Sequence, residues 1–412
     1  MILVAIQFLT LLGGLLVNFF VPFYYGLEAY GTFIQANILV FVFQKLTDIV
    51  NEPLIGQAEA SQIFPLAAAL SSLVWIVFVL VDQTLFPLGS PILLASMLAS
   101  ACVSLGLYSL RWHRTLLAYL LLFISLFFVL IGVKEFGIWQ LGIVEILIWT
   151  NALAILPVVA PLALKVRWQG SGKLLSSALL RAPSNISVTL VFNLFTNLLP
   201  YLLSKTLSHA ELGLFRVMTS VVQSATSIFP VNTKALFVMF SRSEDGEWLY
   251  FSLLRIALAW FAGIAGLALI ASMLDARLLP FIALVGVLPI LYWGVLSERY
   301  LLAQGRRRML ATVNLVIGGA AIVATLWVST MGQALMLYAV SLSLYAALAA
   351  YLNLRGKLRG FVAGLAVITP WVVYVQSFDP FISLIWHLVL FAVSIVLLKM
   401  NSNDLRALMV KL

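Results

Sequence analysis

The segment NLLPYLLSKTLSHAELGLF (residues 197–215) decides the architecture, because a related segment, NFFVPFYYGLEAYGTF (residues 18–33), lies about 180 residues earlier. In each segment an asparagine and a proline end one apolar run. A short turn then leads to a glutamate, a glycine and a phenylalanine that open the next run. These are Glu28, Gly31 and Phe33 in the first segment, and Glu211, Gly213 and Phe215 in the second. The match is short and needs small gaps, but its equivalent placement predicts two halves that repeat each other.

The composition is that of an integral membrane protein. The chain has 412 residues, of which 63% are hydrophobic and 9% are charged. A soluble domain is about half apolar and about a quarter charged. The apolar runs are about 17–25 residues long, which is the length of a membrane-spanning helix, and they lack the alternation of barrel strands. Cys102 is the single cysteine, so an internal disulfide is excluded.

Fourteen spanning helices are predicted. Tight joins at 330–332 and 377–380 leave twelve as an alternative. The run 2–22 lacks the basic start and cleavage site of a signal peptide, so it is interpreted as the first span. The predicted spans are 2–22, 31–52, 63–81, 89–110, 115–132, 138–164, 184–205, 212–238, 249–273, 279–303, 309–330, 332–353, 360–377 and 380–399.

Lysine and arginine residues between the spans predict the orientation, because cytoplasmic loops are enriched in both. One side of the membrane receives 17 of them and the other receives Lys134, Lys205 and Arg277. The first side is therefore predicted to be cytoplasmic, with both termini inside. The net charge of +9 reflects these loops rather than nucleic-acid binding. The 17 residues are Arg111, Arg114, Lys165, Arg167, Lys173, Arg181, Lys234, Arg242, Arg306, Arg307, Arg308, Arg355, Lys357, Arg359, Lys399, Arg406 and Lys411.

This layout predicts an all-α membrane fold with two pseudo-symmetric six-helix lobes and a terminal helix pair. The lobes cover residues 1–164 and 184–353, and the terminal pair with its cytoplasmic tail covers 354–412. Residues 165–183 form a basic linker, interpreted either as an amphipathic segment on the inner leaflet or as an ordinary cytoplasmic loop. Because both lobes start inside, we expect a parallel repeat about an axis along the membrane normal.

Four of the spans carry a polar stripe, and these are the first two of each lobe. Polar side chains in lipid are costly unless they face protein or water. The stripes therefore predict a wet cavity, although hydrogen bonding between helices remains an alternative, above all for the hydroxyls. The predicted cavity residues are Gln7 and Asn18; Gln44, Lys45 and Asp48; Thr189, Asn193 and Asn197; and Arg216, Ser220 and Gln223.

Arg216 is the sharpest candidate for a substrate contact. It lies on the striped face, about one turn inside the predicted outer end of the span 212–238. A guanidinium group stays charged and binds phosphate through two hydrogen bonds, so Arg216 is a candidate diphosphate ligand. Alternatively, its side chain reaches the outer membrane interface, or it forms an ion pair with Glu211.

Acidic residues within spans are candidates for coupling transport to H⁺ or Na⁺. Glu145, about two turns into the span 138–164, is one, and Asp48 is the other. Asp48 also lies three residues after Lys45, so a local ion pair is an alternative. For Glu298, Arg299 and Arg255, a position at the membrane interface is the simpler interpretation.

The sequence carries little that favours an enzyme. It has no Walker motif, and its three histidines lie on different elements without metal-ligand spacing. No resident cofactor or metal is expected. A membrane polymerase or ligase would need catalytic residues on long outer loops, and every predicted outer loop is short.

The two repeated segments resemble the Wzx-like polysaccharide flippases of the multidrug/oligosaccharidyl-lipid/polysaccharide exporter superfamily. The resemblance rests on LEAYGTF (residues 27–33), on SKTLSHAELGLF (residues 204–215) and on the overall layout. Members of this family carry similar motifs at both places, and the helices that line their cavity correspond to the striped spans. One departure concerns an Asp–Arg pair found in many relatives, where this chain has Asn197, two leucines, Pro200 and Tyr201.

The resemblance implies that the chain flips an undecaprenyl-diphosphate-linked oligosaccharide from the inner to the outer leaflet of a bacterial inner membrane by alternating access. O-antigen, capsule or exopolysaccharide assembly is the implied pathway, with its polymerase and glycosyltransferases as implied partners. A lipid II-type flippase and a cation-coupled drug antiporter of the same superfamily remain alternatives. A membrane polymerase or ligase is the alternative from another class.

Overall fold

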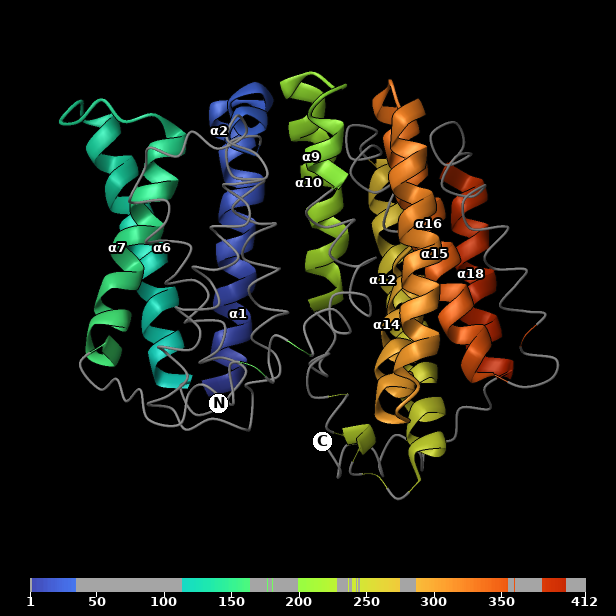
Figure 1. Cartoon of the computed structure of the whole chain (residues 1–412). Coiled ribbons are helices and arrows are strands. Elements are labelled where there is room, and N and C mark those ends of the chain that lie inside the picture. The colour runs from blue at the N-terminus through green and yellow to red at the C-terminus, as the bar shows by residue number, and fades with distance from the viewer. Residues whose placement is uncertain are drawn as a thin grey trace. The chain divides into compact units, whose positions relative to one another are not determined.

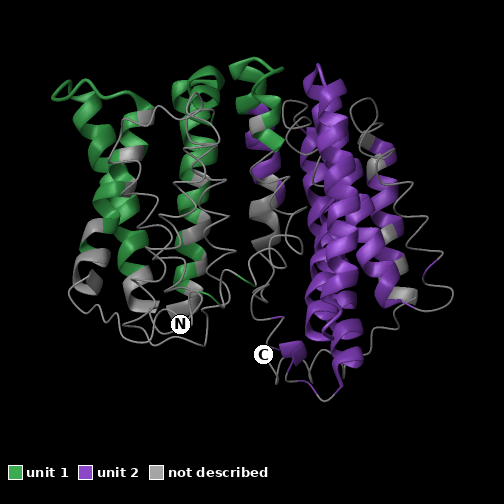
Figure 2. Cartoon of the chain, viewed as in Figure 1, with its two compact units in different colours: residues 1–213 green, residues 214–412 purple. Residues whose placement is uncertain are grey.

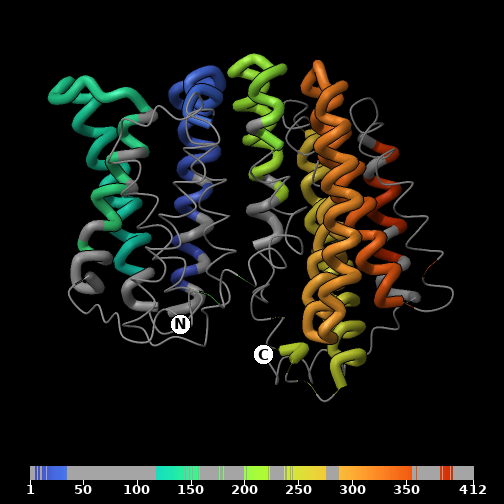
Figure 3. The backbone as a smooth tube through the Cα atoms, in the orientation of Figure 1, coloured from blue at the N-terminus to red at the C-terminus, as the bar shows by residue number. Residues whose placement is uncertain are grey.

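The computed structural model describes residues 2–34, 113–163, 176, 180, 199–227, 236, 239–241, 243, 245–274, 287–354, 359 and 380–397. Within these ranges all regular elements are helices and no strand occurs (Figures 1 and 3). Four helices of this described part are long and apolar enough to cross a membrane. They are Leu117–Glu135, Gly246–Leu274, Arg307–Trp327 and Met331–Asn353. The all-helical character and the presence of several helices of spanning length are therefore confirmed.

The chain divides into two compact units, Met1–Gly213 and Leu214–Leu412 (Figure 2). The division falls within helix α10 (His209–Ser227). The predicted linker 165–183, which separates the two predicted lobes, lies outside the described residues except for Ser176 and Leu180.

The first unit begins with a single helical run that changes its winding. Helix α1 (Ile2–Leu15) continues into a π-helical turn, Leu16–Phe20, and then into α2 (Val21–Tyr25). Pro22 accounts for the change, because its ring lacks an N–H and collides with the carbonyl group four residues earlier, that of Asn18. The extra residue in the π-turn accommodates the proline without ending the run, and π-turns of this kind often mark functional positions.

Helix α6 (His113–Glu135) packs against α1 and against α7 (Ile143–Ala163). The Tyr25 hydroxyl donates a hydrogen bond of 3.2 Å to Glu135 Oε1, and Lys134 Nζ lies 4.4 Å from the centre of the Tyr25 ring. Burial and the Glu135 carboxylate raise the pKa of Tyr25 to about 12, so its phenol remains a donor at neutral pH.

These contacts place the ends of α2 and α6 at the same end of the unit, so α1 and α6 run parallel. Parallel spans require an odd number of crossings between them. The three predicted spans 31–52, 63–81 and 89–110 meet that condition, and they lie outside the described residues apart from positions 31–34.

In the second unit, α12 (Gly246–Leu274) packs against both α14 (Leu288–Ala303) and α18 (Pro380–Leu397). Helix α14 packs against α16 (Met331–Asn353), and α15 (Arg307–Ala324) lies against both. Side chains buried in the second unit include the aromatic rings of Phe261, Tyr292 and Tyr338.

The tight join predicted at 330–332 is a real break between two helices. A 3-10 turn, Thr325–Trp327, ends α15, and Thr330 caps the start of α16. The Thr330 side chain accepts a hydrogen bond from Gln333 N, while the Gln333 side chain accepts one from Thr330 N, which is a reciprocal capping box. At this join the prediction of two separate helices is therefore correct. The second predicted join, 377–380, is described only from Pro380.

Between α14 and α15 the chain turns at Gly305, whose φ of 74° lies in the left-handed region that favours glycine. Arg306 N donates to Leu301 O and Gly305 N donates to Leu302 O, so the last carbonyl groups of α14 are satisfied. Arg306, Arg307 and Arg308 follow directly and are exposed. This turn therefore has the geometry and charge of the predicted cytoplasmic loop.

Helices α14 and α16 touch backbone to backbone at Gly294. A Cβ atom at this position would lie 2.7 Å from both Cα and Cβ of Ala346. We expect Gly294→Ala to destabilise the second unit by about 1–3 kcal/mol, the usual cost of overpacking a close contact. Thermal unfolding in detergent measures this effect. Gly263→Ala on α12 is the matched control, since nothing lies within 4 Å of its added Cβ; equal melting temperatures for the two variants would contradict the prediction.

Candidate functional site

The two repeated segments of the sequence lie directly against each other in the first unit. Gly26, with a φ of 88°, ends α2, and residues 27–34 are helical. A Cβ added at Gly31 would lie 2.5 Å from the carbonyl carbon of His209 and would overlap its oxygen. A Cβ added at Gly213 would lie 3.1 Å from Gly31 N and would overlap the carbonyl oxygen of Leu27. Only glycine permits this crossing of two helix starts.

The crossing is reciprocal. Gly213 follows Gly31, and His209 follows Leu27, by the same 182 residues. Each glycine therefore meets the backbone of the residue four positions before the other glycine, which is the pattern that a local two-fold axis produces. The buried residues of the two segments are related by the same spacing. Tyr30 and Phe33 are buried in the first segment, as are Leu212 and Phe215 in the second.

Asn18, one of the predicted cavity residues, is tied to this crossing. The Tyr30 hydroxyl donates a hydrogen bond of 2.6 Å to Asn18 Oδ1. Asn18 lies in the π-helical turn that accommodates Pro22. The side chain that accepts the hydrogen bond from Tyr30 therefore comes from the segment with altered winding. Tyr30 directly precedes Gly31. The hydrogen bond therefore connects the polar stripe of the first helix to the glycine crossing.

Helix α10 begins with a capping box that the sequence analysis did not identify. Ser208 N and Oγ donate to Glu211 Oε2 at 3.0 and 2.8 Å, and Glu211 N donates to Ser208 Oγ at 3.3 Å. The hydrogen bonds from Ser208, first from its backbone and then from its side chain, lower the pKa of Glu211. The signal was present in the sequence as Ser208 followed three residues later by Glu211.

Removing this cap should lower stability in a pH-dependent way. Because the pKa of Glu211 is lowered on folding, its contribution is present above the carboxyl's ordinary pKa and disappears as the pH falls through the lowered value. Ser208→Ala should cost about 1 kcal/mol at neutral pH. The unfolding temperatures of wild type and Glu211→Gln should differ at neutral pH and converge in acid. Glu28→Gln, which removes an exposed carboxylate from the equivalent segment, is the control; a pH-independent difference for Glu211→Gln would refute the assignment.

Arg216 lies on α10, three residues after Gly213, and its side chain is half-buried. Because Ser208 caps the helix and α10 starts at His209, Arg216 is about two turns inside the helix and not one, as the sequence had indicated. The Thr219 hydroxyl donates to the carbonyl of Arg216 at 3.1 Å. Ser220 is buried one turn further on, and its Oγ has no hydrogen-bond partner within the part of the chain that the structure describes.

The other predicted cavity residues are only partly placed. Gln7 lies on α1 and Gln223 on α10, and the structure describes only the backbone at these two positions. The remaining ones lie outside the described residues, namely Gln44, Lys45, Asp48, Thr189, Asn193 and Asn197. The structure thus brings Asn18 to the glycine crossing, and it places Arg216 and Ser220 along the helix that starts there.

Glu145 lies in a different setting from the one expected. The chain turns at Gly137, whose φ is 67°, and α7 begins only at Ile143. Glu145 is therefore in the first helical turn, where its exposed side chain accepts a hydrogen bond of 2.8 Å from Gly142 N. The expected position two turns inside a span is wrong, and capping of the helix start explains this carboxylate.

A buried polar cluster that the sequence analysis missed lies in the second unit, between α12, α14 and α16. Glu298 is only 4% exposed, and its Oε2 accepts a hydrogen bond from the Tyr345 hydroxyl. Next to it, Ser297 Oγ is 2.8 Å from the Tyr250 hydroxyl, which also accepts a 3.0 Å hydrogen bond from Trp293 Nε1.

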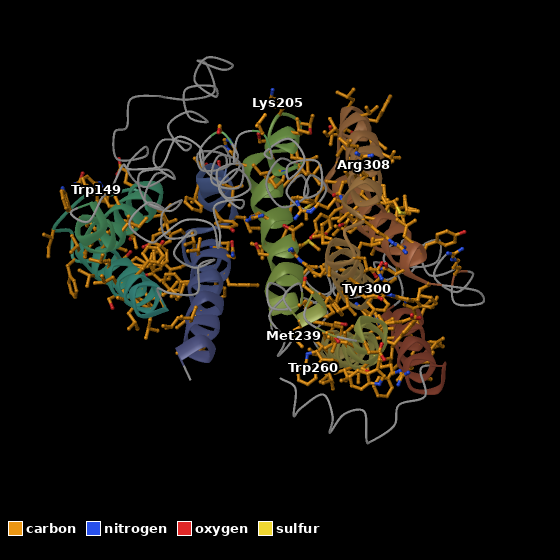
Figure 4. All side chains as sticks on the ribbon, turned by 60° about the horizontal axis from the view of Figure 1, so that its bottom comes forward. Trp149, Lys205, Met239, Trp260, Tyr300 and Arg308 are labelled. Carbon is orange, nitrogen blue, oxygen red and sulfur yellow. The ribbon has the colours of Figure 1, made fainter. Side chains whose placement is uncertain are left out.

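Two further contacts extend this cluster. Asn353 Nδ2 donates to the backbone oxygen of Ser297 at 2.9 Å. Tyr300 is labelled among the side chains of the second unit in Figure 4. Its ring stacks on that of Tyr250, with ring centroids 4.9 Å apart. The helices packed around α14 bury Glu298, five residues before the end of that helix. Its predicted depth at the membrane interface stays a prediction.

Comparison of the chain with family models, with curated proteins and with solved structures found no match.

Proposed function

We propose that this protein is a multi-pass transporter that flips a lipid-linked oligosaccharide from the inner to the outer leaflet by alternating access. The observation that carries the proposal is the reciprocal crossing of Leu27–Gly31 and His209–Gly213. Each of these segments follows a predicted outer turn and opens a helix with a polar stripe. A transporter built from two parallel repeats is expected to bring such equivalent helices together around its pathway.

The crossing is suited to a closure that must open again. It relies on close backbone approach at two glycines. Small residues at helix contacts allow tight packing in a membrane, where the hydrophobic effect does not drive helices together. In the orientation predicted from the basic loops, the crossing closes the outer end of the pathway.

The chemistry near the crossing supports an amphiphilic, phosphorylated cargo. Arg216 supplies a permanent positive charge with paired donors for a diphosphate. Asn18 and Ser220, whose Oγ has no hydrogen-bond partner among the described residues, supply the kinds of groups that bind sugar hydroxyls. The resemblance of the repeated segments to Wzx-like flippases specifies the cargo as an undecaprenyl-diphosphate oligosaccharide, and the bacterial inner membrane as the location. The polymerase and glycosyltransferases of surface-polysaccharide assembly would then be its partners.

Deletion of the gene tests the proposal. We expect surface polysaccharide to be lost and complete lipid-linked repeat units to accumulate in the inner leaflet, where they stay protected from reagents added outside spheroplasts. Expression of the wild-type chain should restore both. If repeat units instead reach the outer leaflet without being joined, the chain is a polymerase or ligase and the proposal fails. Accumulation of lipid II with cell lysis would identify the lipid II-type alternative, and drug sensitivity alone would identify an antiporter.

A further inference from the structure

We infer that each half of the chain carries a membrane anchor in an apolar turn, and that both turns lie among lipid headgroups. The first turn, residues 136–142, joins α6 to α7. The second, residues 326–330, leads from the end of α15 into α16. Each follows the fifth span of its predicted lobe, so the turns occupy equivalent places in the predicted repeat. The partner that they fit is a phospholipid surface, whatever cargo the chain carries.

Both turns expose large apolar side chains. In the first turn Phe136 is 84% exposed and Trp139 is 57% exposed. In the second turn Leu326 is 80% exposed and Trp327 is 71% exposed. Neither turn contains a charged residue, whereas three consecutive arginines follow the turn between α14 and α15. Contact with water is unfavourable for such apolar surface, and tryptophan is enriched where membrane meets water.

An exposed apolar stripe leads along each preceding helix to its turn. Both helices are long and apolar enough to cross a membrane, so lipid tails are the natural surroundings of such a stripe. Steps of four, seven and eight residues keep the side chains on one helical face. The exposed residues are Leu121, Phe128 and Phe136 for the first turn, and Met309, Val316, Val323 and Trp327 for the second. The turns therefore continue surfaces that already face lipid.

The lengths of the two helices place the turns at the edge of the hydrocarbon core. The apolar stretches of spanning length are Leu117–Glu135, with 19 residues, and Arg307–Trp327, with 21 residues. At about 1.5 Å per residue they are about 28 to 32 Å long, close to the hydrocarbon thickness of about 30 Å. The first turn therefore begins where the headgroups begin, and Trp327 ends the second stretch at that level.

The backbone of the first turn is suited to a place with little water. Gly137 N donates to Lys134 O at 2.9 Å, and Ile138 N donates to Val133 O at 3.1 Å. These two bonds form a Schellman motif that satisfies carbonyl groups at the end of α6. Unpaired backbone groups are costly away from water, and the motif reduces that cost.

The second turn achieves the same by another route. Val328 N donates to Thr325 O at 3.2 Å, which closes the 3-10 turn. The capping box of Thr330 and Gln333 then satisfies N–H groups at the start of α16. Both turns thus combine exposed apolar side chains with internal backbone hydrogen bonds.

The first anchor lies at the same end of its unit as the glycine crossing. Glu135 directly precedes the turn and accepts the hydrogen bond from Tyr25, at the end of α2 (Figure 1). Phe23 on α2 is also exposed at this end. In the predicted orientation this is the outer end, so the anchor would hold the first unit at the level of the outer headgroups.

Spin-label accessibility in phospholipid vesicles tests both anchors. In the full-length protein with Cys102→Ser, a nitroxide is attached at Ile138→Cys or Leu326→Cys, which keeps both tryptophans. Each label should collide with dissolved oxygen and lose most of its access to a water-soluble nickel chelate. The control, Gln304→Cys, lies on the exposed turn before the arginines and should stay accessible to nickel. Nickel access at positions 138 and 326 equal to that at position 304 would overturn the inference.

Removing the tryptophans tests whether they hold the turns in place. Trp139→Ala should raise nickel access at position 138, and Trp327→Ala should raise it at position 326. The matched control is Trp260→Ala, which removes an exposed tryptophan of α12 and should change neither. Unchanged access in both turn variants would contradict the anchoring role.

A contact between copies of the chain would give a different pattern. The labels would then be shielded from oxygen as well as from nickel, and the shielding would weaken as the ratio of lipid to protein rises. That outcome would assign the turns to self-association and overturn the lipid assignment. Shielding from nickel alone, at every ratio of lipid to protein, is the result that we expect.

Discussion

Gly31→Ala and Gly213→Ala should each abolish transport, although both variants should insert in the membrane. In each case the added methyl group would meet the backbone of the partner segment, at His209 or at Leu27. A flexible side chain could move aside at little cost, but a helical backbone cannot. The two helix starts must therefore separate, and the closed form of this end loses about 1–3 kcal/mol, the usual cost of overpacking.

A change of this size alters the balance between two conformations by about 5- to 150-fold. Because alternating access requires both forms, the cycle should stop with the predicted outer end open. The double variant should resemble either single variant, since both changes break the same contact and neighbouring mutations are not additive.

Two measurements check this expectation. Cargo flipping should be lost, and a cysteine placed on the striped face of α10 should react faster with a polar thiol reagent added from outside, in a background where Cys102 is replaced. Gly132→Ala on α6 is the matched control, because nothing lies within 4 Å of its added Cβ. Normal flipping by both Gly31→Ala and Gly213→Ala would show that the crossing does not close the pathway.

Hydropathy predicted the described helices well because the length of an apolar run sets the length of a spanning helix. Helix α6 covers the predicted span 115–132, and α12 covers 249–273. The starts of helices were less accurate, since they depend on capping and turn residues. Helix α10 starts before the predicted position because Ser208 caps it. Helix α7 starts after the predicted position because the chain first turns at Gly137.

The candidate site was only partly predictable. The repeat indicated that Gly31 and Gly213 are equivalent, but equivalence in sequence does not say that two positions touch. Their contact depends on the direction in which each helix starts, which is set by turns such as the one at Gly26. Glu298 could be recognised as a charge within a predicted span. Its burial depends on Tyr345, 47 residues later, and no periodicity within α14 reports that neighbour.

Arg216→Ala should remove transport while leaving the fold intact, and Arg216→Lys should restore only part of it. If Arg216 holds the diphosphate, alanine loses a charge-assisted pair of hydrogen bonds, worth about 1.5–3 kcal/mol for each bond to a charged group. Lysine keeps the charge but cannot donate in the same planar, two-pronged geometry. We therefore expect alanine to weaken binding of undecaprenyl diphosphate at least about tenfold, with lysine between alanine and the wild type.

This ordering separates a ligand from a side chain that only anchors the helix at the interface. An arginine that reaches the interface is replaced by lysine without loss, because both side chains extend an apolar stem and place a charge in water. Arg255→Ala on α12 controls for the removal of a half-buried arginine from another helix. Binding of undecaprenyl diphosphate and of undecaprenol should be measured side by side in detergent. A loss confined to the diphosphate identifies Arg216 as its ligand, whereas equal binding by wild type, lysine and alanine variants assigns Arg216 to the interface.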